Sequence, residues 1–194
     1  MAVENPNLIW IDCEMTGLSL AHDALVEIAV LVTDSELNII GDGVDVVIKA
    51  SAEQIAGMND FVTKMHTDSG LITEIPNGIS VSDAEELIIK YLESAGVTSG
   101  KSPLAGNSVY VDRIFITRDM PKLSEYLHYR TIDVSSIKEL ARRWYPKTYF
   151  AAPAKTGNHR ALGDIRDSIA ELTYYREALF VAPATNSPAE EVNG

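Results

Sequence analysis

The chain has 194 residues with 16 lysines and arginines against 28 aspartates and glutamates, which gives a formal net charge of -12 and a pI near 4.7. Hydrophobic residues make up 46% of the chain, enough apolar surface for one domain with a buried core. The only cysteine, Cys13, excludes an intrachain disulfide and favours a reducing compartment. We see neither a secretory signal at the start nor an apolar run near the ~20 residues of a membrane span, and therefore expect a cytoplasmic protein with no membrane partner.

The charges are unevenly distributed along the chain. Residues 1–112 hold four basic and 18 acidic side chains, whereas residues 113–147 hold eight basic and four acidic ones. Two interpretations fit the basic stretch: the solvated face of amphipathic helices, or a small anion site. Neither supplies the extended basic surface that a long duplex nucleic acid requires.

Three strands are predicted in the first 50 residues. Residues 7–14 (NLIWIDCE) form a short apolar run that ends in acids, and residues 25–33 are rich in Val, Ile and Ala. A polar break at 34–36 leads to a third β-rich stretch, 43–48. Three consecutive strands predict an antiparallel start to the sheet.

Helical patterns begin after residue 50. The sequence at 82–85 (SDAE) predicts a capping box that opens a helix. One face of that helix carries its apolar residues, which are Leu87, Ile88, Tyr91 and Leu92. A short strand is then predicted at 101–107, followed by a helix that begins near Tyr110.

The last third of the chain predicts one more strand and two more helices. The strand covers 131–134, and the helices cover 135–144 and 159–179. Prolines and glycines at 145–158 predict an exposed loop between the helices. The Pro-, Ala- and Asn-rich tail at 182–194 is predicted to be disordered. The order βββαβαβα predicts an α/β domain with a mixed β-sheet of about five strands flanked by α-helices.

Two carboxylates lie together at the end of the first strand. Side chains alternate across a strand, so Asp12 and Glu14 point to one face of the sheet while Ile11 and Cys13 point to the other. Such a pair is costly in a central strand unless a cation or a proton compensates the charge. Taken alone, the pair is equally consistent with solvated acids that end a strand.

Two further acids and a histidine extend this pattern. Asp112 follows the strand at 101–107 and lies near a helix start, where an acid also complements the helix dipole. His159 and Asp164 are five residues apart, which is about 140° around a helix, so they cannot share a helical face. We therefore place Asp164 on the last helix and His159 at its first residue or in the loop before it.

Together these residues predict a centre for phosphodiester hydrolysis. Asp12, Glu14, Asp112 and Asp164 carry a formal charge of -4, which matches two divalent cations, and hard oxygen ligands favour Mg²⁺ or Mn²⁺ over zinc. One ion would activate a water and the other would stabilise the leaving 3′ oxygen. His159 has an imidazole suited to take the proton of that water at neutral pH.

The motifs that carry these residues resemble a known family. The segments IDCEMTGL (11–18), GNSVYVD (106–112) and HRALGD (159–164) resemble the DEDD-type 3′→5′ exonucleases with a histidine base, which have a ribonuclease-H-like fold. Within that group, LHYRTIDVSSIKELARRWYP (127–146) and AELTYYRE (170–177) resemble oligoribonucleases. The similarity runs from about residue 7 to 180 and includes stretches without candidate catalytic residues.

The resemblance implies a 3′→5′ exoribonuclease that degrades very short RNA, mainly diribonucleotides and including the linear products of cyclic dinucleotide breakdown, to mononucleotides. It implies one exonuclease domain over 1–180, with a tail at 181–194, and a homodimer. Asp12, Glu14, Asp112 and Asp164 would bind two metal ions, with His159 as general base. Further roles implied by the resemblance are base contacts from Leu18 and Phe61, a 5′-phosphate cap from His66, Ser108 and Arg130, and a contribution from Tyr129 to the partner subunit's site.

The sequence departs from the family pattern at two positions. Residue 61 is Phe where relatives carry Trp, which keeps an aromatic face, and Gly163 occupies a position where relatives often have a second Asp. Tyr129 and Arg130 are neighbours near the start of a predicted strand, so we expect their side chains to diverge, one serving its own site and the other a neighbouring subunit.

Three alternatives remain. A DNA exonuclease of the same superfamily would carry the same acids. A non-catalytic nucleotide-binding module would lack an acid or the histidine, whereas all five positions are intact here. A haloacid-dehalogenase-type phosphatase needs an Asp-x-Asp pair, and this chain has Glu14 as the second acid.

Overall fold

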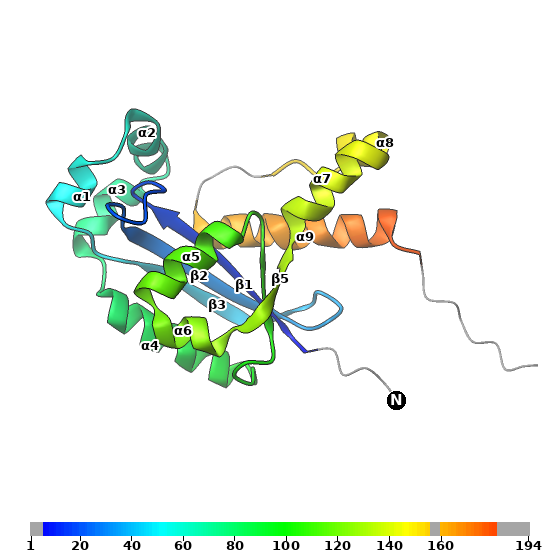
Figure 1. The fold of residues 1–194 in the computed structure, drawn as a ribbon, viewed down its shortest axis with the longest axis horizontal. Helices are drawn as coiled ribbons and strands as arrows, with labels where there is room; N and C mark the ends of the chain where they lie inside the picture. The colour runs from blue at the N-terminus through cyan, green and yellow to red at the C-terminus, as the bar shows by residue number, and fades with distance from the viewer. Residues whose placement is uncertain (1–5, 156–159, 182–194) are drawn as a thin grey trace, which may run out of the picture.

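The computed structural model describes residues 6–155 and 160–181. A five-stranded mixed sheet forms its centre, in the order β3-β2-β1-β4-β5 (Figure 1). The first three strands pair antiparallel, and β4 and β5 continue the sheet parallel to β1. This architecture confirms the predicted α/β fold. The strands are β1 (Leu8–Met15), β2 (Leu25–Thr33), β3 (Ile39–Val47), β4 (Pro103–Gly106) and β5 (His128–Asp133).

The central strands are buried on both faces. All nine residues of β2 are buried, and β1 sends Ile9 and Ile11 into one core while Leu8 and Trp10 pack into the other. Successive side chains of a strand point to opposite faces of the sheet, so Asp12 and Glu14 lie on the same face as Trp10. The strands that begin earlier than predicted, β3 at Ile39 and β5 at His128, are the two edges of the sheet.

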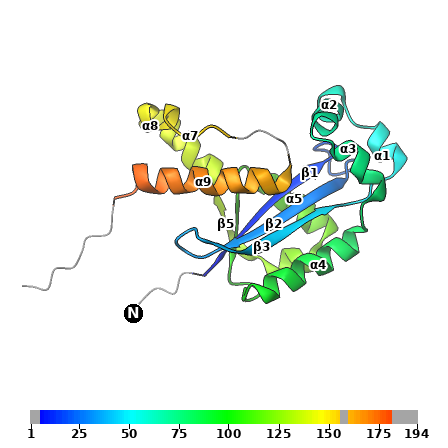
Figure 2. The same cartoon turned by 180° about the vertical axis from the view of Figure 1, so that it is seen from behind.

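Helices cover both faces of the sheet (Figures 1 and 2). The helices α4, α5 and α6 pack on the face of Ile9, and α7 and α9 on the face of Trp10. Short helices α1 to α3 gather at one end of the sheet, around a small core that includes Val26. The helices are α1 (Ala52–Ala56), α2 (Asp60–Asp68), α3 (Leu71–Glu74), the 3-10 helix η1 (Ile75–Asn77), α4 (Val81–Ser94), α5 (Tyr110–Asp119), α6 (Pro121–Tyr126), α7 (Val134–Trp144), α8 (Pro146–Phe150) and α9 (Ala161–Leu179).

The predicted capping box at 82–85 is wrong. The cap of α4 is Ser80, whose hydroxyl accepts a hydrogen bond from the Asp83 amide at 3.1 Å. Glu85 is instead buried, and its carboxylate accepts a hydrogen bond from the Leu123 amide at the start of α6, at 3.0 Å. Two Ser residues two positions apart both satisfy the local pattern, and the tertiary role of Glu85 decides between them.

Two predictions near the end of the chain also need correction. The segment predicted as a loop from residue 145 contains α8, which begins with Pro146 at the helix position that tolerates a missing amide hydrogen. The last helix begins at Ala161, two residues later than predicted. His159 and the predicted disordered tail at 182–194 lie outside the described residues. Among the helices of the described chain, none has the length and apolar character needed to cross a membrane.

Candidate active site

The candidate site lies where the carboxyl ends of three parallel strands meet. Because β1, β4 and β5 run in the same direction, the residues that follow them gather at one edge of the sheet. Asp12 and Glu14 lie near the end of β1, Ser108 follows β4, and Asp133 ends β5. Neighbouring strands are about 4.8 Å apart, so these groups lie within the span of a small ligand.

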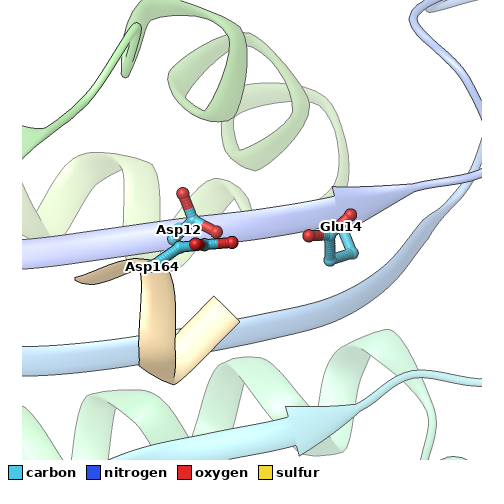
Figure 3. A group of neighbouring side chains, drawn as sticks. All are labelled: Asp12, Glu14 and Asp164. Carbon is cyan, nitrogen blue, oxygen red and sulfur yellow. The ribbon is translucent and has the colours of Figure 1, made fainter. Parts of the chain in front are cut away.

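Three of the four predicted metal ligands form one cluster. Asp12, Glu14 and Asp164 each offer a carboxylate oxygen, and these atoms lie within 4.8 Å of one another. Figure 3 shows how they meet: two side chains leave β1 on the side of α9, and Asp164 comes from the first turn of α9 to face Asp12. Carboxylates held at this separation provide an oxygen donor set that suits a hard divalent cation.

Asp112 adjoins this cluster without belonging to the group that meets within 4.8 Å. It lies in the first turn of α5, as predicted, and is only 6% exposed. Its carboxylate is hydrogen bonded with Cys13 of β1, the residue between the two clustered acids. After burial, the charge of Asp112 is the largest cause that raises the pKa of Asp12, so the two carboxylates act on each other electrostatically.

Burial and mutual repulsion favour the protonated forms of these acids. Burial raises the pKa of Glu14 to about 8, and Glu27 and Asp164 add the largest electrostatic contributions. Burial also raises the pKa of Asp112 to about 7, although its own hydrogen bonds oppose the change. The pKa of Asp12 is raised well above its usual value for the same reason. Lys155 and Arg160 lower the pKa values of Asp12 and Glu14 respectively, but burial and the neighbouring acids outweigh them, as expected of a cation site.

A buried ionic network anchors the beginning of α9. Glu27 of β2 is fully buried opposite Glu14, and its carboxylate accepts hydrogen bonds from Arg160 Nε at 2.7 Å and from the Ala161 amide at 3.1 Å. Arg160 also donates both terminal nitrogens to the carboxylate of Glu74, each at 3.1 Å. The network sets the position at which α9 starts and thereby the position of Asp164 one turn later.

Ser108 belongs to a polar cluster beside the acids. It adopts a left-handed backbone conformation with φ of 51°. Its amide donates to Asp133 Oδ1 and to Ser135 Oγ, both at 3.0 Å, and the two serine hydroxyls are 3.2 Å apart. A surface pocket of about 550 Å³ opens beside this cluster, lined by residues that include Ser108, Tyr110, Ser135, Leu140 and Arg143. Ser108 is exposed and offers its hydroxyl to a phosphate or sugar oxygen, whereas the Ser135 hydroxyl donates to Asn107 Oδ1 at 3.0 Å.

Tyr129 and Arg130 are both exposed on the edge strand β5. Their side chains do not diverge as predicted: the Arg130 guanidinium carbon lies 5.4 Å from the centre of the Tyr129 ring. A long side chain on an edge strand can fold back over its neighbour, and a cation is attracted to the face of an aromatic ring. Tyr129 is 73% exposed, so most of its ring is open to a ligand or a protein partner.

His66 occupies a different place from the other residues expected to cap a phosphate. Its side chain is fully buried, with Nε2 2.9 Å from the Met15 carbonyl oxygen and Nδ1 4.0 Å from a Glu14 carboxylate oxygen. A ring with no exposed surface cannot contact a phosphate in this conformation. The structure therefore associates His66 with the end of β1 and not with the cluster of Ser108.

The two residues expected to contact bases are exposed. Leu18, in the connection between β1 and β2, is 73% exposed, and Phe61 at the start of α2 is 75% exposed. Both views show that this connection lies beside α2, at the end of the sheet where β1 terminates (Figures 1 and 2). Large apolar side chains with this exposure offer a surface on which a planar base can pack.

Comparison with known proteins identifies the family. Residues 9–172 match the RNase_T family, described as exonuclease. An oligoribonuclease of Streptomyces griseus is 60% identical over 177 residues, which cover 91% of this chain and 88% of that protein. The chain belongs to the oligoribonuclease family. A second oligoribonuclease, from Rhodococcus jostii strain RHA1, is 56% identical over 189 residues and 95% of each chain. As a member of this family, the chain is a nuclease of the hydrolase class.

Solved structures support the fold of this oligoribonuclease-family chain. A zinc-bound complex of Escherichia coli exonuclease I with single-stranded DNA has a TM-score of 0.69 at 15% identity and matches 91% of this chain. The apo form of exonuclease I gives a TM-score of 0.66 at 17% identity. The chain spans about two fifths of the length of exonuclease I, 41% in the first case. At these identities the likeness shows the ribonuclease-H-like fold.

Sequence reasoning missed several residues at this oligoribonuclease-family site. Glu27 carried a signal, because it is an acid within the otherwise apolar run of β2 and so required a buried partner. Asp133 and Ser135 had no comparable signal, because an acid and a serine around a helix start are common as caps. In the structure Asp133 does cap α7, because its carboxylate accepts a hydrogen bond from the Ser135 amide at 2.9 Å.

Proposed function

We propose that the chain is a 3′→5′ exoribonuclease that acts in the cytoplasm on short oligoribonucleotides. Its preferred substrates are diribonucleotides, including linear products of cyclic dinucleotide breakdown, and its products are 5′-mononucleotides. The observation that carries this proposal is the carboxylate cluster of Asp12, Glu14 and Asp164 beside the exposed Ser108 cluster, in a chain of the oligoribonuclease family. The acidic composition of the chain, with a net charge of -12, favours a short substrate over a long one.

The residues at the site fit two divalent cations, Mg²⁺ or Mn²⁺. All the donors are carboxylate oxygens, and burial raises the pKa of Asp12 and of Glu14, with neighbouring acids adding to the rise. Asp12, Glu14, Asp112 and Asp164 would hold the ions. When bound, the ions would supply Lewis-acid activation of water and stabilisation of the leaving 3′ oxygen.

The remaining roles belong to side chains of this chain. His159 takes the proton of the attacking water at its imidazole nitrogen. Leu18 and Phe61 pack against the bases, while Ser108 donates to the 5′ phosphate and Arg130 binds it through its guanidinium. A closed contact with the terminal phosphate limits substrate length, because a further nucleotide would have to displace it.

We include a homodimer in the proposal, with Tyr129 of each subunit reaching the site of its partner. The aromatic ring of Tyr129 lies on an edge strand with 73% of its surface exposed. The helix α7, which follows β5 in the chain, also exposes Leu140 and Trp144, and the segment after it exposes Tyr145 and Phe150. Exposed apolar residues gathered in adjacent elements are typical of a protein interface.

The decisive experiment compares hydrolysis of a 5′-phosphorylated diribonucleotide with that of an RNA of about 20 nucleotides and the matched DNAs. We expect rapid release of mononucleotides from the diribonucleotide in Mg²⁺ or Mn²⁺, slow cleavage of the long RNA and no cleavage in EDTA. Asp12→Asn serves as the control for contaminating nucleases, and His159→Ala should lower kcat by about 10²–10⁴-fold with the cations still bound.

Each departure from this pattern removes a defined part of the proposal. Preference for the long RNA would refute the phosphate contact while leaving the metal site intact. Faster cleavage of DNA would favour the repair-type exonuclease. Full activity of His159→Ala would refute its role as the base.

A further inference from the structure

The connection between β1 and β2 is a closed, internally bonded loop. At its neck, the Thr16 amide donates to the Ala24 carbonyl oxygen and the Ala24 amide donates to Thr16 Oγ1, both at 2.9 Å. The carboxylate of Asp23 holds the interior: Oδ1 accepts from the Thr16 hydroxyl at 3.0 Å, and Oδ2 accepts from the Ser19 amide at 2.8 Å. We call residues 16–24 the Leu18 loop.

Gly17 allows this loop to close tightly. A Cβ atom at Gly17 would lie 2.5 Å from Asp23 Oδ2 and 2.7 Å from its carboxyl carbon. Any larger residue would therefore push the carboxylate away from its two donors. The loop has one compact arrangement around Asp23, and Leu18 projects from it with 73% of its surface exposed.

Arg118 of α5 fastens this loop to the body of the protein from far along the chain. Its Nη1 donates to the Leu20 carbonyl oxygen at 2.5 Å, and its Nη2 donates to the Asp23 carbonyl oxygen at 2.9 Å. The neighbouring Asp119 holds the guanidinium in place, accepting from Nε at 2.7 Å and from Nη2 at 2.6 Å. All three guanidinium nitrogens thus point at partners within the protein.

We infer that Arg118 is a positioning residue that holds Leu18 ready for the base of the substrate before binding occurs. A mobile loop would lose conformational entropy when its leucine packs on a base, and this loss would weaken binding. A loop that is already held in one conformation avoids that loss when the substrate binds. The inference rests on the role of Leu18 in the proposed function and extends it to residues that do not touch substrate. Arg118, Asp23 and Gly17 thereby contribute to affinity through Leu18.

Direct attraction of RNA by the Arg118 charge is the competing explanation. The side chain is 31% exposed, and its charge is paired with the adjacent Asp119 carboxylate at 2.6 Å. A lysine at this position keeps the charge but lacks the planar fork that reaches two carbonyl oxygens and a carboxylate together. The two explanations therefore predict opposite results for Arg118→Lys.

The test measures KM and kcat for a 5′-phosphorylated diribonucleotide in four variants of the full chain. Leu18→Ala should raise KM about tenfold, because packing of one apolar side chain is lost. Arg118→Lys and Asp23→Asn should each raise KM about five- to tenfold with kcat nearly unchanged, as expected when binding alone is weakened. Gly17→Ala disturbs the same loop without altering its charge and should raise KM to a similar extent. Thermal melting of each variant identifies any that has failed to fold.

Combining substitutions separates positioning from a general loss of stability. In the Leu18→Ala background, Arg118→Lys should cause little further rise in KM, because the side chain that it positions is already gone. Arg176→Lys is the matched control. Arg176, near the end of α9, donates to the carbonyl oxygen and the carboxylate of Glu36, and its replacement should leave KM unchanged.

Several outcomes would overturn the inference. If Arg118→Lys and Leu18→Ala multiply each other's effects, Arg118 acts independently of Leu18. If Arg118→Lys leaves KM unchanged while Asp23→Asn lowers KM, the charges of these side chains and not the geometry of the Leu18 loop determine substrate affinity. An unchanged KM in Leu18→Ala would refute the assignment of Leu18 itself and the positioning role with it, and an intact chain that cleaves no diribonucleotide would refute the proposed function first.

Discussion

Burial is what makes the carboxylates of the candidate site chemically unusual. Glu14 is 8% exposed and Asp112 is 6% exposed, and both lie among other acids. Positive charge is close by but engaged elsewhere: Lys155 lowers the pKa of Asp12 while pairing with the buried Glu171 at 3.6 Å, and Arg160 bonds Glu27 and Glu74. The hydrogen bonds and close ion pairs of Lys155 and Arg160 are thus made with Glu171, Glu27 and Glu74, while burial and neighbouring acids keep the pKa values of Asp12 and Glu14 raised.

Metal-free protein should lose stability as the pH rises through the range in which these acids ionise. The folded pKa values of Glu14 and Asp112, about 8 and about 7, lie above their ordinary values of 4.5 and 3.8, so the native state holds more protons than the unfolded state in between. This contribution is fully present below about pH 4 and is lost as the pH rises through about 7 to 8. Divalent cations bind the deprotonated carboxylates, so Mg²⁺ or Mn²⁺ should raise the Tm more at about pH 8 than at about pH 6.

Thermal melts in EDTA and in excess Mg²⁺ or Mn²⁺ at the two pH values test this expectation. Glu14→Gln removes the acid with the higher of the two pKa values and should flatten the pH dependence of the melts in EDTA. Equal cation-induced shifts of Tm at both pH values in the unmodified protein would contradict the assignment.

Helix starts position the site at the scale of elements. The last helix, α9, begins where Glu27 accepts the Ala161 amide and pairs with Arg160, and this start sets the turn on which Asp164 faces β1. Glu27, whose carboxylate fixes this start, is 133 residues from Arg160 in sequence. At α4, by contrast, the start is set by a local contact, the bond from the Asp83 amide to Ser80.

Two serines on α4 provide a matched comparison of capping. Ser80→Ala should lower the free energy of unfolding by about 1 kcal/mol, because one of the first amides of the helix loses its acceptor. Ser82→Ala removes the same hydroxyl from an exposed position inside the helix and should change stability by less than about 0.5 kcal/mol. Urea denaturation of both variants measures the difference, and a larger loss in Ser82→Ala would restore the cap expected from the sequence.

The arrangement of the whole molecule brings the functional residues to one sheet edge. Three parallel strands end there, with β1 contributing acids and the segments after β4 and β5 contributing Ser108 and Ser135. The same arrangement leaves β5 as an edge strand with an exposed Tyr129, and α7, which follows β5 directly, exposes Leu140 and Trp144. A site next to an exposed apolar surface is suited to completion by a second subunit.

Mixing two defective variants tests whether Tyr129 acts across a dimer. Tyr129→Ala should weaken diribonucleotide cleavage by about 5- to 100-fold, the range for loss of one aromatic stacking contact. When it is mixed with His159→Ala under subunit exchange, the Tyr129→Ala subunit keeps its own His159 and receives Tyr129 from its partner. Activity should therefore rise toward about a quarter of the wild-type value, with one intact site in each mixed dimer.

The control mixture pairs Asp12→Asn with His159→Ala. Asp12 and His159 each serve the site of their own subunit in the proposal. Each subunit of a mixed dimer therefore has a defective site, and no activity should return. Absence of recovery in the Tyr129→Ala mixture, with dimers verified by sedimentation, would show that Tyr129 does not serve the partner.

The sequence by itself determined the order of the main elements and the residue types of the candidate metal site. Alternation along residues 7–14 and the apolar run at 25–33 are local patterns that reflect which faces are buried, and they predicted β1, β2 and the shared face of Asp12 and Glu14. The spacing of His159 and Asp164 placed Asp164 on the last helix, and the structure has Asp164 in the first turn of α9, which begins at Ala161. Local periodicity sufficed because it is imposed by the geometry of a single strand or helix.

Only the tertiary structure decided the contacts between residues far apart in sequence. It placed His66 in the core beside Glu14, joined Glu27 to Arg160, and fastened the Leu18 loop to Arg118. Each of these polar groups has many sequence partners that local rules allow. The choice among them is made when burial removes water and each group must find a partner within the fold.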